Sequence, residues 1–368
     1  MNRIILIGNG FDLAHGLKTS YKHFIDNFWE NEKKKIIEHI NKYSGECVAH
    51  IENGVYRDNF IEITKCRYKN LITNIKGSGY EWFKNFSRIM SDTQTSVFIR
   101  NKFLEKISEK THLENWVDIE EEYYIQLHEC LGNQSGESVK KLNEEFLAVQ
   151  KALEEYLTEQ QNDNATEINE TVFTSLFYEK YIEKYPHNPK YKEVYRSTDF
   201  LFLTFNYTNT EKAYIDDILS RQDIDRSKIM NIHIHGELGS EKNPIIFGYG
   251  DEIGEKYKIF EEANNNDYLE YTKSIKYLET NNYKKMLTFI EAGEYEIFVM
   301  GHSCGISDRT LLNTLFENEN CKSIKVFFHK KDGKDNYSDV IRNISRNFND
   351  KKLFRKIVLN KTECELLS

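Results

Sequence analysis

The chain has 368 residues, with 59 Asp and Glu against 50 Lys and Arg, which gives a formal net charge of −9. This acidic balance argues against a protein that coats nucleic acid, because phosphate contacts need clustered Lys and Arg, and it leaves room only for a local basic groove. No apolar run approaches the roughly 20 residues that span a bilayer, and Met1 leads directly into an apolar segment. We therefore expect a cytoplasmic protein without membrane contact.

The cysteines are scattered and form no C-x-x-C pair: Cys47, Cys66, Cys130, Cys304, Cys321 and Cys364. Neither a zinc ribbon nor a disulfide framework is indicated, and buried or incidental thiols are the simpler interpretation. The length is sufficient for one large domain or two ordinary ones. We expect one domain that carries a large insertion.

The first strand is the clearest element of the chain. Four apolar residues, Ile4 to Ile7, run into Gly8-Asn9-Gly10. This pattern is typical of a buried parallel strand whose following turn exposes backbone N–H groups to a phosphate. Gly8-x-Gly10 lacks the third glycine of the usual dinucleotide fingerprint, and a purely structural turn needs the same glycines. A nucleotide site and a plain strand-to-helix turn are both open interpretations here.

From about residue 21 to residue 195 the pattern is helical. The clearest stripe has apolar side chains three and four residues apart, which places them on one helix face: Val139, Leu142, Phe146, Val149, Leu153 and Tyr156. We expect residues 21–195 to be an inserted all-α region between the two parts of the core, residues 1–20 and 196–368.

Short apolar segments return after the helical region and alternate with helical patterns. The expected strands are Phe200–Phe205, Asn231–His235, Ile245–Phe247, Glu296–Met300, Ile324–Phe328 and a late edge strand at Arg355–Leu359. Strands that alternate with helices predict a doubly wound, mostly parallel, Rossmann-like α/β sheet, in which the N-terminal strand pairs with strands some two hundred residues later.

Polar or glycine-rich clusters follow these strands. They are Gly8–Asp12, Thr204–Thr210, His233–Gly236, Phe247–Asp251 and Gly301–Asp308. Ligands of such sheets lie outside the carboxyl ends of the strands, so these clusters are where we expect the functional site.

The same segments carry a family resemblance that extends over nearly the whole chain. Gly8–Tyr21, Trp116–Glu120, Phe205–Thr208, His233–Gly236 and Gly301–Ser303 with Asp308 together resemble the AbiH family of bacterial phage abortive-infection proteins. Their order also resembles, more distantly, the sirtuin-like NAD-binding fold, whose antiphage members cleave NAD. The resemblance implies an NAD-consuming defence effector.

The chain departs from the sirtuin pattern in two respects. No cysteine spacing can build the four-cysteine zinc module of sirtuin deacylases, so protein deacylation is not expected. The glycine loop is Gly-Asn-Gly-Phe-Asp where sirtuins have a Gly-Ala-Gly sequence, which leaves NAD, NADP and other adenine nucleotides open as the ligand. We expect NAD as a substrate, no resident cofactor and no metal.

Asn206 and His235 are the expected catalytic residues, and both match the Asn and His motifs of the sirtuin-like fold. Asn206 can orient water or a ribose hydroxyl, and His235 can accept a proton near neutral pH. The simpler interpretation of Asn206 is a turn residue that bonds its own backbone. His233 shares a strand face with His235, and for His233 a buried, hydrogen-bonded core histidine is the simpler interpretation.

The expected nucleotide-binding residues are Gly8, Asn9, Gly10, Phe11, Asp12, Thr204, Gly301, His302, Ser303 and Asp308. Gly301, His302 and Ser303 would close around the adenosine half of the ligand. Asp12 either bonds a ribose hydroxyl or caps the following helix, and we favour the cap. Asp308 precedes the helical pattern that starts at Arg309 and either contacts the nucleotide or simply caps that helix, so we favour Ser303 over Asp308 as a binding residue.

Trp116–Tyr123 is a crowded acidic segment that includes Asp118, Glu120, Glu121 and Glu122. Paired carboxylates can bind a metal or perform acid–base chemistry, and the family resemblance adds a role in closing the pocket. A solvated acidic helix start is the interpretation that we favour.

Three functions follow from these patterns. The first is an antiphage NAD glycohydrolase whose helical insertion senses infection or mediates assembly, as a homo-oligomer or with a defence partner. The second is a non-catalytic module that binds NAD or ADP-ribose. The third is a metal-dependent nucleotide or nucleic-acid hydrolase that uses the carboxylates near Trp116. The missing Walker lysine motif and the acidic balance count against the third.

Overall fold

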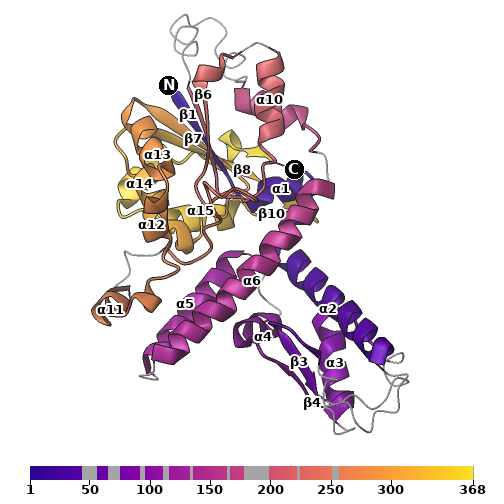
Figure 1. Ribbon diagram of the computed structural model, residues 1–368. Helices are drawn as coiled ribbons and strands as arrows, with labels where there is room; N and C mark the ends of the chain where they lie inside the picture. The colour runs from indigo at the N-terminus through magenta and orange to yellow at the C-terminus, as the bar shows by residue number, and fades with distance from the viewer. Residues whose placement is uncertain are drawn as a thin grey trace, which may run out of the picture. The chain divides into compact units, whose positions relative to one another are not determined.

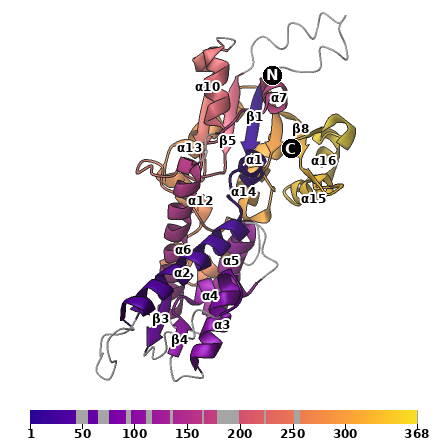
Figure 2. The ribbon, with the colours of Figure 1, turned by 90° about the vertical axis from the view of Figure 1, so that its right-hand side faces the viewer.

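The computed structural model describes residues 1–43, 56–64, 75–91, 96–110, 116–132, 136–163, 166–177, 199–221, 224–250 and 257–367. The chain divides into two compact units, both drawn in Figures 1 and 2. The first unit consists of Met1–Thr19 and Leu157–Ser368, and the second of Ser20–Tyr156. The first boundary between the units, after Thr19, lies next to residue 21, where we expected the insertion to start. The second boundary, after Tyr156, lies inside helix α6 (Gly136–Asp163), well before residue 195, where we expected the insertion to end.

A six-stranded sheet forms the centre of the first unit. Its order is β11 (Glu365–Leu366), β8 (Cys321–Phe328), β7 (Tyr295–Met300), β1 (Asn2–Ile7), β5 (Phe200–Thr204) and β6 (Ile229–His233). Every neighbouring pair is parallel. From β1 the chain builds β5 and β6 on one side, and then crosses to build β7, β8 and β11 on the other. This is the strand order of a doubly wound Rossmann-like sheet, which confirms the expected fold class.

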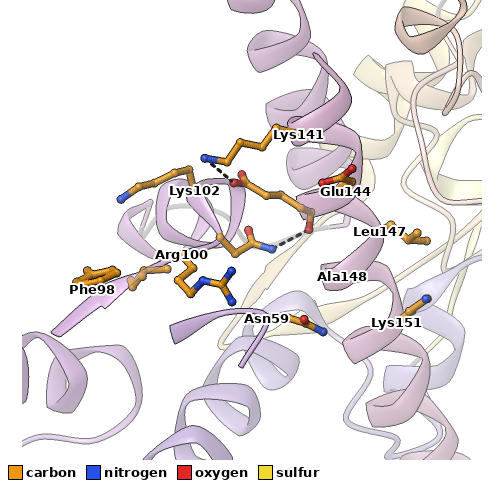
Figure 3. Close-up of a pocket in the computed structure, with 12 residues that line it drawn as sticks. Asn59, Phe98, Arg100, Lys102, Lys141, Glu144, Leu147, Ala148 and Lys151 are labelled. Atoms are coloured by element: carbon orange, nitrogen blue, oxygen red, sulfur yellow. Dashed lines mark hydrogen bonds and ion pairs between the residues drawn. The ribbon is translucent and has the colours of Figure 1, made fainter. Parts of the chain in front are cut away.

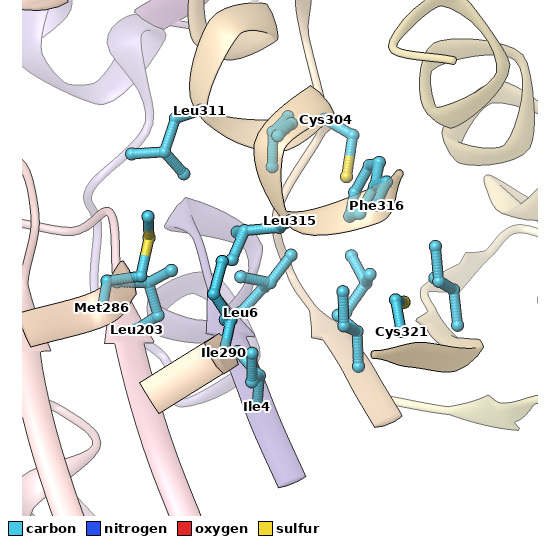
Figure 4. Packing of buried hydrophobic residues seen from close by; sticks show 14 of the residues in the cluster. Ile4, Leu6, Leu203, Met286, Ile290, Cys304, Leu311, Leu315, Phe316 and Cys321 are labelled. Atoms are coloured by element: carbon cyan, nitrogen blue, oxygen red, sulfur yellow. The ribbon is translucent and has the colours of Figure 1, made fainter. Parts of the chain in front are cut away.

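Helices cover both faces of this sheet, so both faces are buried. Successive side chains of a strand point to opposite faces. Ile4 and Leu6 pack in a cluster with α13 (Asn282–Glu291), α14 (Arg309–Phe316), α15 (Tyr337–Arg346) and α16 (Lys351–Ile357). Figure 4 shows them together with Leu311 and Leu315 of α14. Ile5 packs on the other face with α1 (Asn9–Ala14), α7 (Glu170–Phe177) and α10 (Lys212–Ser220). The described part of this unit also contains α11 (Tyr257–Glu262) and α12 (Lys273–Lys276).

The second unit is mostly helical, but the expectation of an all-α insertion is wrong. Its helices are α2 (Tyr21–Tyr43), α3 (Gly79–Ser91), α4 (Lys102–Glu109), α5 (Trp116–Gly132) and the first part of α6. It also contains an antiparallel sheet of β2 (Tyr56–Arg57), β3 (Ile61–Thr64) and β4 (Ser96–Ile99). These strands are too short to stand out from their helical surroundings in the sequence. The apolar stripe of α6 from Val139 to Tyr156 is buried, as expected.

Two expected strands are wrong. Ile245–Phe247 is a buried loop segment with no strand pairing, and Ile246 N–H donates to the carbonyl of His235 at 2.7 Å. Arg355–Leu359 lies mostly in α16, whose start is capped by the Asp350 carboxylate. The short β11 takes its place at the edge of the sheet. In the described parts of the chain we find no helix that is both long and apolar enough to cross a membrane.

Candidate functional site

Four loops meet at the carboxyl edge of the central sheet. They follow β1, β5, β6 and β7, which are close neighbours in the strand order. Most of the expected site residues lie in these loops, and their side chains contact one another as described below. Of the fifth cluster, Phe247–Asp251, the last residue lies outside the described residues.

The loops after β1 and β7 pack directly against each other. Backbone N–H groups of Gly8, Gly10 and Phe11 donate to the carbonyls of Met300, Gly301 and Gly8, at 3.1, 2.8 and 2.8 Å. A Cβ atom on Gly10 would lie 2.8 Å from Cα of Gly301, and one on Gly8 would lie 2.5 Å from Cα of His302. Of the turn Gly8-Asn9-Gly10, whose N–H groups we expected to face a phosphate, the N–H groups of Gly8 and Gly10 are thus already bonded. The glycines permit the close approach of two loops, and their part in ligand binding stays a prediction.

Asp12 does not cap α1, since Gly8 occupies the N-cap position and Asp12 lies inside the helix. Its carboxyl group is 1% exposed, and Oδ2 accepts a hydrogen bond from Thr208 Oγ1 at 2.5 Å. Oδ1 has no hydrogen-bond partner among the described residues. Burial raises the pKa of Asp12 to about 6, against a lowering by the side chains of Thr208 and Thr210, and the charge of Glu211 adds to the rise. The favoured capping interpretation was therefore wrong.

Asn206 joins the loop after β5 to the loop after β1 at the carboxyl edge. Its Nδ2 donates to the carbonyl oxygen of Gly8 at 3.0 Å. The side chain is buried and also faces Asp12, whose pKa it lowers. Asn206 thus bonds a neighbouring loop and not the backbone of its own turn. Its position between Gly8 and Asp12 is compatible with the expected role.

The two histidines at the end of β6, His233 in the strand and His235 after it, have different surroundings. His233 contacts Oε1 of Glu211 through Nε2 at 3.0 Å and the carbonyl of Asn206 through Nδ1 at 3.2 Å. Burial lowers the pKa of His233, but the hydrogen bond and charge of Glu211 outweigh burial and raise it overall. His233 is the buried, hydrogen-bonded histidine that we expected.

His235 lies against a different group of polar side chains. Its Nε2 is 3.0 Å from the hydroxyl of Tyr277 and 3.2 Å from Oδ1 of Asp308. Burial lowers the pKa of His235 to about 4; the ammonium group of Lys273 adds to the lowering, and Asp308 opposes it. The imidazole is therefore neutral at neutral pH. When Nε2 carries the proton and donates it to Asp308, Nδ1 is the basic nitrogen.

Asp308 is the centre of this polar group. Its Oδ1 pairs with Lys273 Nζ at 2.9 Å, and Oδ2 lies 3.5 Å from His302 Nε2. Burial favours the neutral acid, but Lys273 and then His235 hold the pKa of Asp308 well below its usual range. Asp308 stands at the N-cap position of α14, yet its side chain makes no capping bond. It is an ionised carboxylate directed to two histidines.

His302 is the second histidine that Asp308 contacts, and a backbone hydrogen bond fixes its tautomer. Its Nδ1 accepts from the backbone N–H of Cys304 at 2.9 Å, so the neutral ring carries its proton on Nε2, toward Asp308. Ser303 is half-buried, and its carbonyl accepts from Asn343 Nδ2 at 2.8 Å. Thr204 is fully buried at the end of β5, and its hydroxyl has no hydrogen-bond partner in the described parts of the chain.

Three members of the site were not among the predicted site residues: Lys273, Tyr277 and Thr208. Thr208 lies within the cluster after β5 and was visible there. Lys273 and Tyr277 come from α12 and the turn after it, in a stretch of mixed Tyr, Lys and Glu that carries no local signal. Only the folded chain brings them to Asp308 and His235.

The acidic segment lies in the second unit, at the start of α5. The side chains of Trp116 and Asp118 lie outside the described residues. Glu121 is exposed, but Glu120 and Glu122 are buried, and Glu122 forms an ion pair with Lys110. The interpretation of a solvated helix start was therefore wrong for Glu120 and Glu122, which are buried, and a half-buried lysine pairs with one of them.

Among the described residues, no three His, Cys, Asp or Glu side chains are grouped so that they could hold a metal ion. Lys273 supplies a buried cation at the carboxyl edge. Gly8–Asp12, Asn206, His235 and Gly301–Ser303 follow strands that lie side by side there.

Comparison with known proteins identifies the family. The family model described as "Bacteriophage abortive infection AbiH" matches residues 4–330, which include the whole second unit, most of the first unit and the carboxyl-edge residues named above. Neither a curated protein nor a solved structure matches the chain. The match over most of the sequence shows that the chain belongs to the AbiH family of bacteriophage abortive-infection proteins.

Proposed function

We propose that this chain is an antiphage effector that hydrolyses NAD at the bond between nicotinamide and ribose. Membership of the AbiH family gives the role in abortive infection. The observation that carries the chemical part is the contact of His235 with Asp308 at the carboxyl edge of a Rossmann-like sheet. Such an edge is where doubly wound folds bind dinucleotides.

The proposed reaction needs few groups from the protein. The C1′–N bond breaks with its electron pair going to the nicotinamide ring, which leaves as a neutral base and needs no acid. An oxocarbenium-like ribose remains, as in glycoside hydrolysis. A water oxygen bonds to C1′, and one proton of that water is released. The products are nicotinamide, ADP-ribose and a proton.

His235 is the group that we propose accepts this proton. Its neutral imidazole has Nε2 engaged by Asp308 and Tyr277, so Nδ1 is the nitrogen that takes the proton. An ionised Asp308 then stabilises the imidazolium that forms, as the carboxylate of a catalytic triad does. Because its pKa is about 4, His235 is neutral at neutral pH before the reaction.

Asn206 is the group that we propose orients the ribose or the water. Its amide is fixed by the bond to the Gly8 carbonyl, so it need not lose conformational freedom when the ligand binds. The adjacent Asp12, with a pKa raised to about 6, can accept a ribose hydroxyl through Oδ1. Gly301, His302 and Ser303 would then lie along the adenosine half.

A second candidate function is a nucleotide sensor that binds NAD or ADP-ribose without cleaving it. The burial of the proposed catalytic side chains favours it, because Asn206, His235 and Asp308 are all at most 8% exposed. Water and substrate must reach these groups before any chemistry can occur. In this function the ligand would stabilise an assembly, and His235 would be dispensable.

The test is product analysis with the purified full chain and NAD in water enriched in ¹⁸O. We expect nicotinamide and ADP-ribose in equal amounts, with the label at C1′ of the ribose. Asn206→Ala and His235→Ala should each lower the rate by about 10² or more, while the exposed His329→Ala should not change it. Saturable NAD binding without product would reject the hydrolase in favour of the sensor. An unchanged rate in His235→Ala would reject the proposed role of His235 as the proton acceptor.

A further inference from the structure

A groove in the second unit lies between β4 and α6. Its volume is about 690 Å³, within the usual range of small-molecule sites. Figure 3 shows Phe98, Arg100 and Lys102 along one side and the α6 side chains along the other. The residues that line it are Asn59, Phe98, Ile99, Arg100, Asn101, Lys102, Lys141, Glu144, Glu145, Leu147, Ala148 and Lys151. All of them belong to residues 20–156, so this groove is separate from the carboxyl edge.

The groove is basic although the unit that contains it is acidic. Residues 20–156 carry 23 Asp and Glu against 19 Lys and Arg. The groove reverses this balance, because Arg100, Lys102, Lys141 and Lys151 face two glutamates. A small cluster of positive charge can bind a compact anionic ligand. A long nucleic acid would extend beyond the groove onto the acidic surface and be repelled there, so the compact ligand is favoured.

The lysines of the groove have few partners. Lys102 lies 2.7 Å from Glu105 in an ion pair whose side chains are partly exposed, and Lys151 makes no ion pair with any residue that the structure describes. Arg100 is held more firmly, because it lies 3.6 Å from Glu62 and also donates to the backbone carbonyl of Asp58. Exposed ion pairs contribute little to stability, so the lysines can exchange their present partners for phosphate oxygens at small cost.

Glu145, which lines the groove, holds its two sides together. Oε2 of Glu145 accepts from the backbone N–H of Phe103 at 3.0 Å, and the carbonyl of Glu145 accepts from Asn101 Nδ2 at 2.8 Å. Lys141 lies 3.8 Å from the other carboxylate oxygen. These bonds join the segment after β4 to α6, which holds Arg100 and Lys102 opposite the lysines of the helix.

An aromatic ring stands beside these cations. Phe98 is 43% exposed, on the open face of β4, and Leu147 is 36% exposed on α6. An exposed ring next to Lys and Arg is the arrangement on which proteins stack a nucleobase while they hold its phosphates. A peptide strand added to β4 is disfavoured, because Ser87 Oγ of α3 already donates to the carbonyl of Val97 at 3.3 Å.

We propose that this groove binds a phosphorylated nucleotide, with the base on Phe98 and the phosphates on Arg100, Lys102, Lys141 and Lys151. The ligand is either a free nucleoside polyphosphate or the end of a short single strand, since both present the same chemistry. The proposal does not depend on NAD hydrolysis. It gives the second unit a ligand of its own.

The experiment measures binding of two probes to the full chain carrying His235→Ala: ATP, and a labelled 5′-phosphorylated hexathymidylate. Lys141→Glu is compared with Lys140→Glu, an exposed neighbour on α6 that does not line the groove. We expect Lys141→Glu to weaken binding of at least one probe about tenfold and to reduce its salt dependence by about one counterion. Phe98→Ala should weaken it about fivefold or more, and Lys140→Glu should leave it within about twofold.

The two probes distinguish a free nucleotide from the end of a single strand. Tighter binding of ATP identifies a free nucleoside polyphosphate as the ligand, and tighter binding of the hexathymidylate identifies the strand end. Three results would overturn the proposal. The first is no saturable binding of either probe below about 1 mM. The second is an equal loss in Lys140→Glu and Lys141→Glu, which would reveal general charge attraction. The third is tighter binding of a decaglutamate peptide than of both probes, which would assign the groove to an acidic protein.

Discussion

Nε2 of His235 lies 3.2 Å from Oδ1 of Asp308, and the same oxygen pairs with Nζ of Lys273 at 2.9 Å. One buried carboxylate therefore fixes the orientation of a neutral imidazole and is itself kept ionised by a buried ammonium. A base, the residue that orients it and a fixed counter-charge are thus joined at one edge of the sheet. The predictions below separate the structural from the chemical part of this arrangement.

Asp308→Asn should lower nicotinamide release by about 10² or more, because the imidazolium of His235 loses its carboxylate. The change also leaves Lys273 buried without its counter-ion, which should cost about 3–5 kcal/mol of the free energy of unfolding. Urea unfolding and rate measurements are made on the same preparations. The double variant Asp308→Asn/Lys273→Met should recover much of the stability and none of the rate, and recovery of the rate would contradict a chemical role for Asp308.

Lys273→Met should raise the pKa of His235 above its value of about 4. Burial is the main cause of that low value, but the ammonium group is the next, and methionine removes it. NMR titration of the imidazole resonances measures the shift. His233, which pairs with Glu211, is the internal control and should keep its pKa. An unchanged pKa for His235 would show that Lys273 does not act on it.

Asp12→Asn should stabilise the chain at neutral pH relative to the wild type. The folded pKa of Asp12 is raised from 3.8 to about 6, so its stabilising contribution is complete below pH 3.8 and is lost as the pH rises to about 6. Asparagine stays neutral and avoids this loss, which amounts to about 3 kcal/mol. Denaturant unfolding at several pH values measures the difference between the two chains. A difference that does not change between about pH 4 and pH 6 would contradict the raised pKa.

Gly301→Ala and Gly239→Ala form a matched pair, because both glycines have a positive φ, +73° and +71°. A Cβ on Gly301 would lie 2.0 Å from the backbone nitrogen of Phe11, whereas one on Gly239 would meet no atom within 4 Å. Gly239→Ala should therefore cost only about 1–2 kcal/mol of conformational strain. Gly301→Ala should cost about 4 kcal/mol or more, or prevent folding. Equal thermal midpoints for the two variants would show that the loops after β1 and β7 are not packed closely.

The central sheet was predictable because its strands are buried on both faces and are therefore nearly continuous apolar runs. Ile4–Ile7 and Phe200–Phe205 are of this kind, and both form strands. The same criterion failed at Ile245–Phe247, where an apolar run packs as a loop. It also failed at Arg355–Leu359, where Phe354 and Ile357, three residues apart, lie in a helix. Burial alone does not distinguish these cases.

The site was predictable only where its residues directly follow strands. Asn206 and His235 could be selected in this way, whereas Lys273 lies in a short helix and joins the site through a contact across 35 residues of chain. The sequence also could not distinguish a cap from a buried acid. Asp12 lies in the first turn of α1 and Asp308 at the N-cap position of α14, yet the bonds of Asp12 to Thr208 and of Asp308 to Lys273 are tertiary.

The most direct test of the account is the NAD concentration in phage-infected cells that produce the wild-type chain, His235→Ala or His329→Ala at equal levels. We expect NAD to fall, with nicotinamide and ADP-ribose appearing in its place, in cells with the wild-type chain and with His329→Ala. Cells with His235→Ala should keep their NAD and lose protection. If infection is aborted while NAD stays constant, or if His235→Ala protects as well as the wild type, NAD hydrolysis at the carboxyl edge is not how this protein acts.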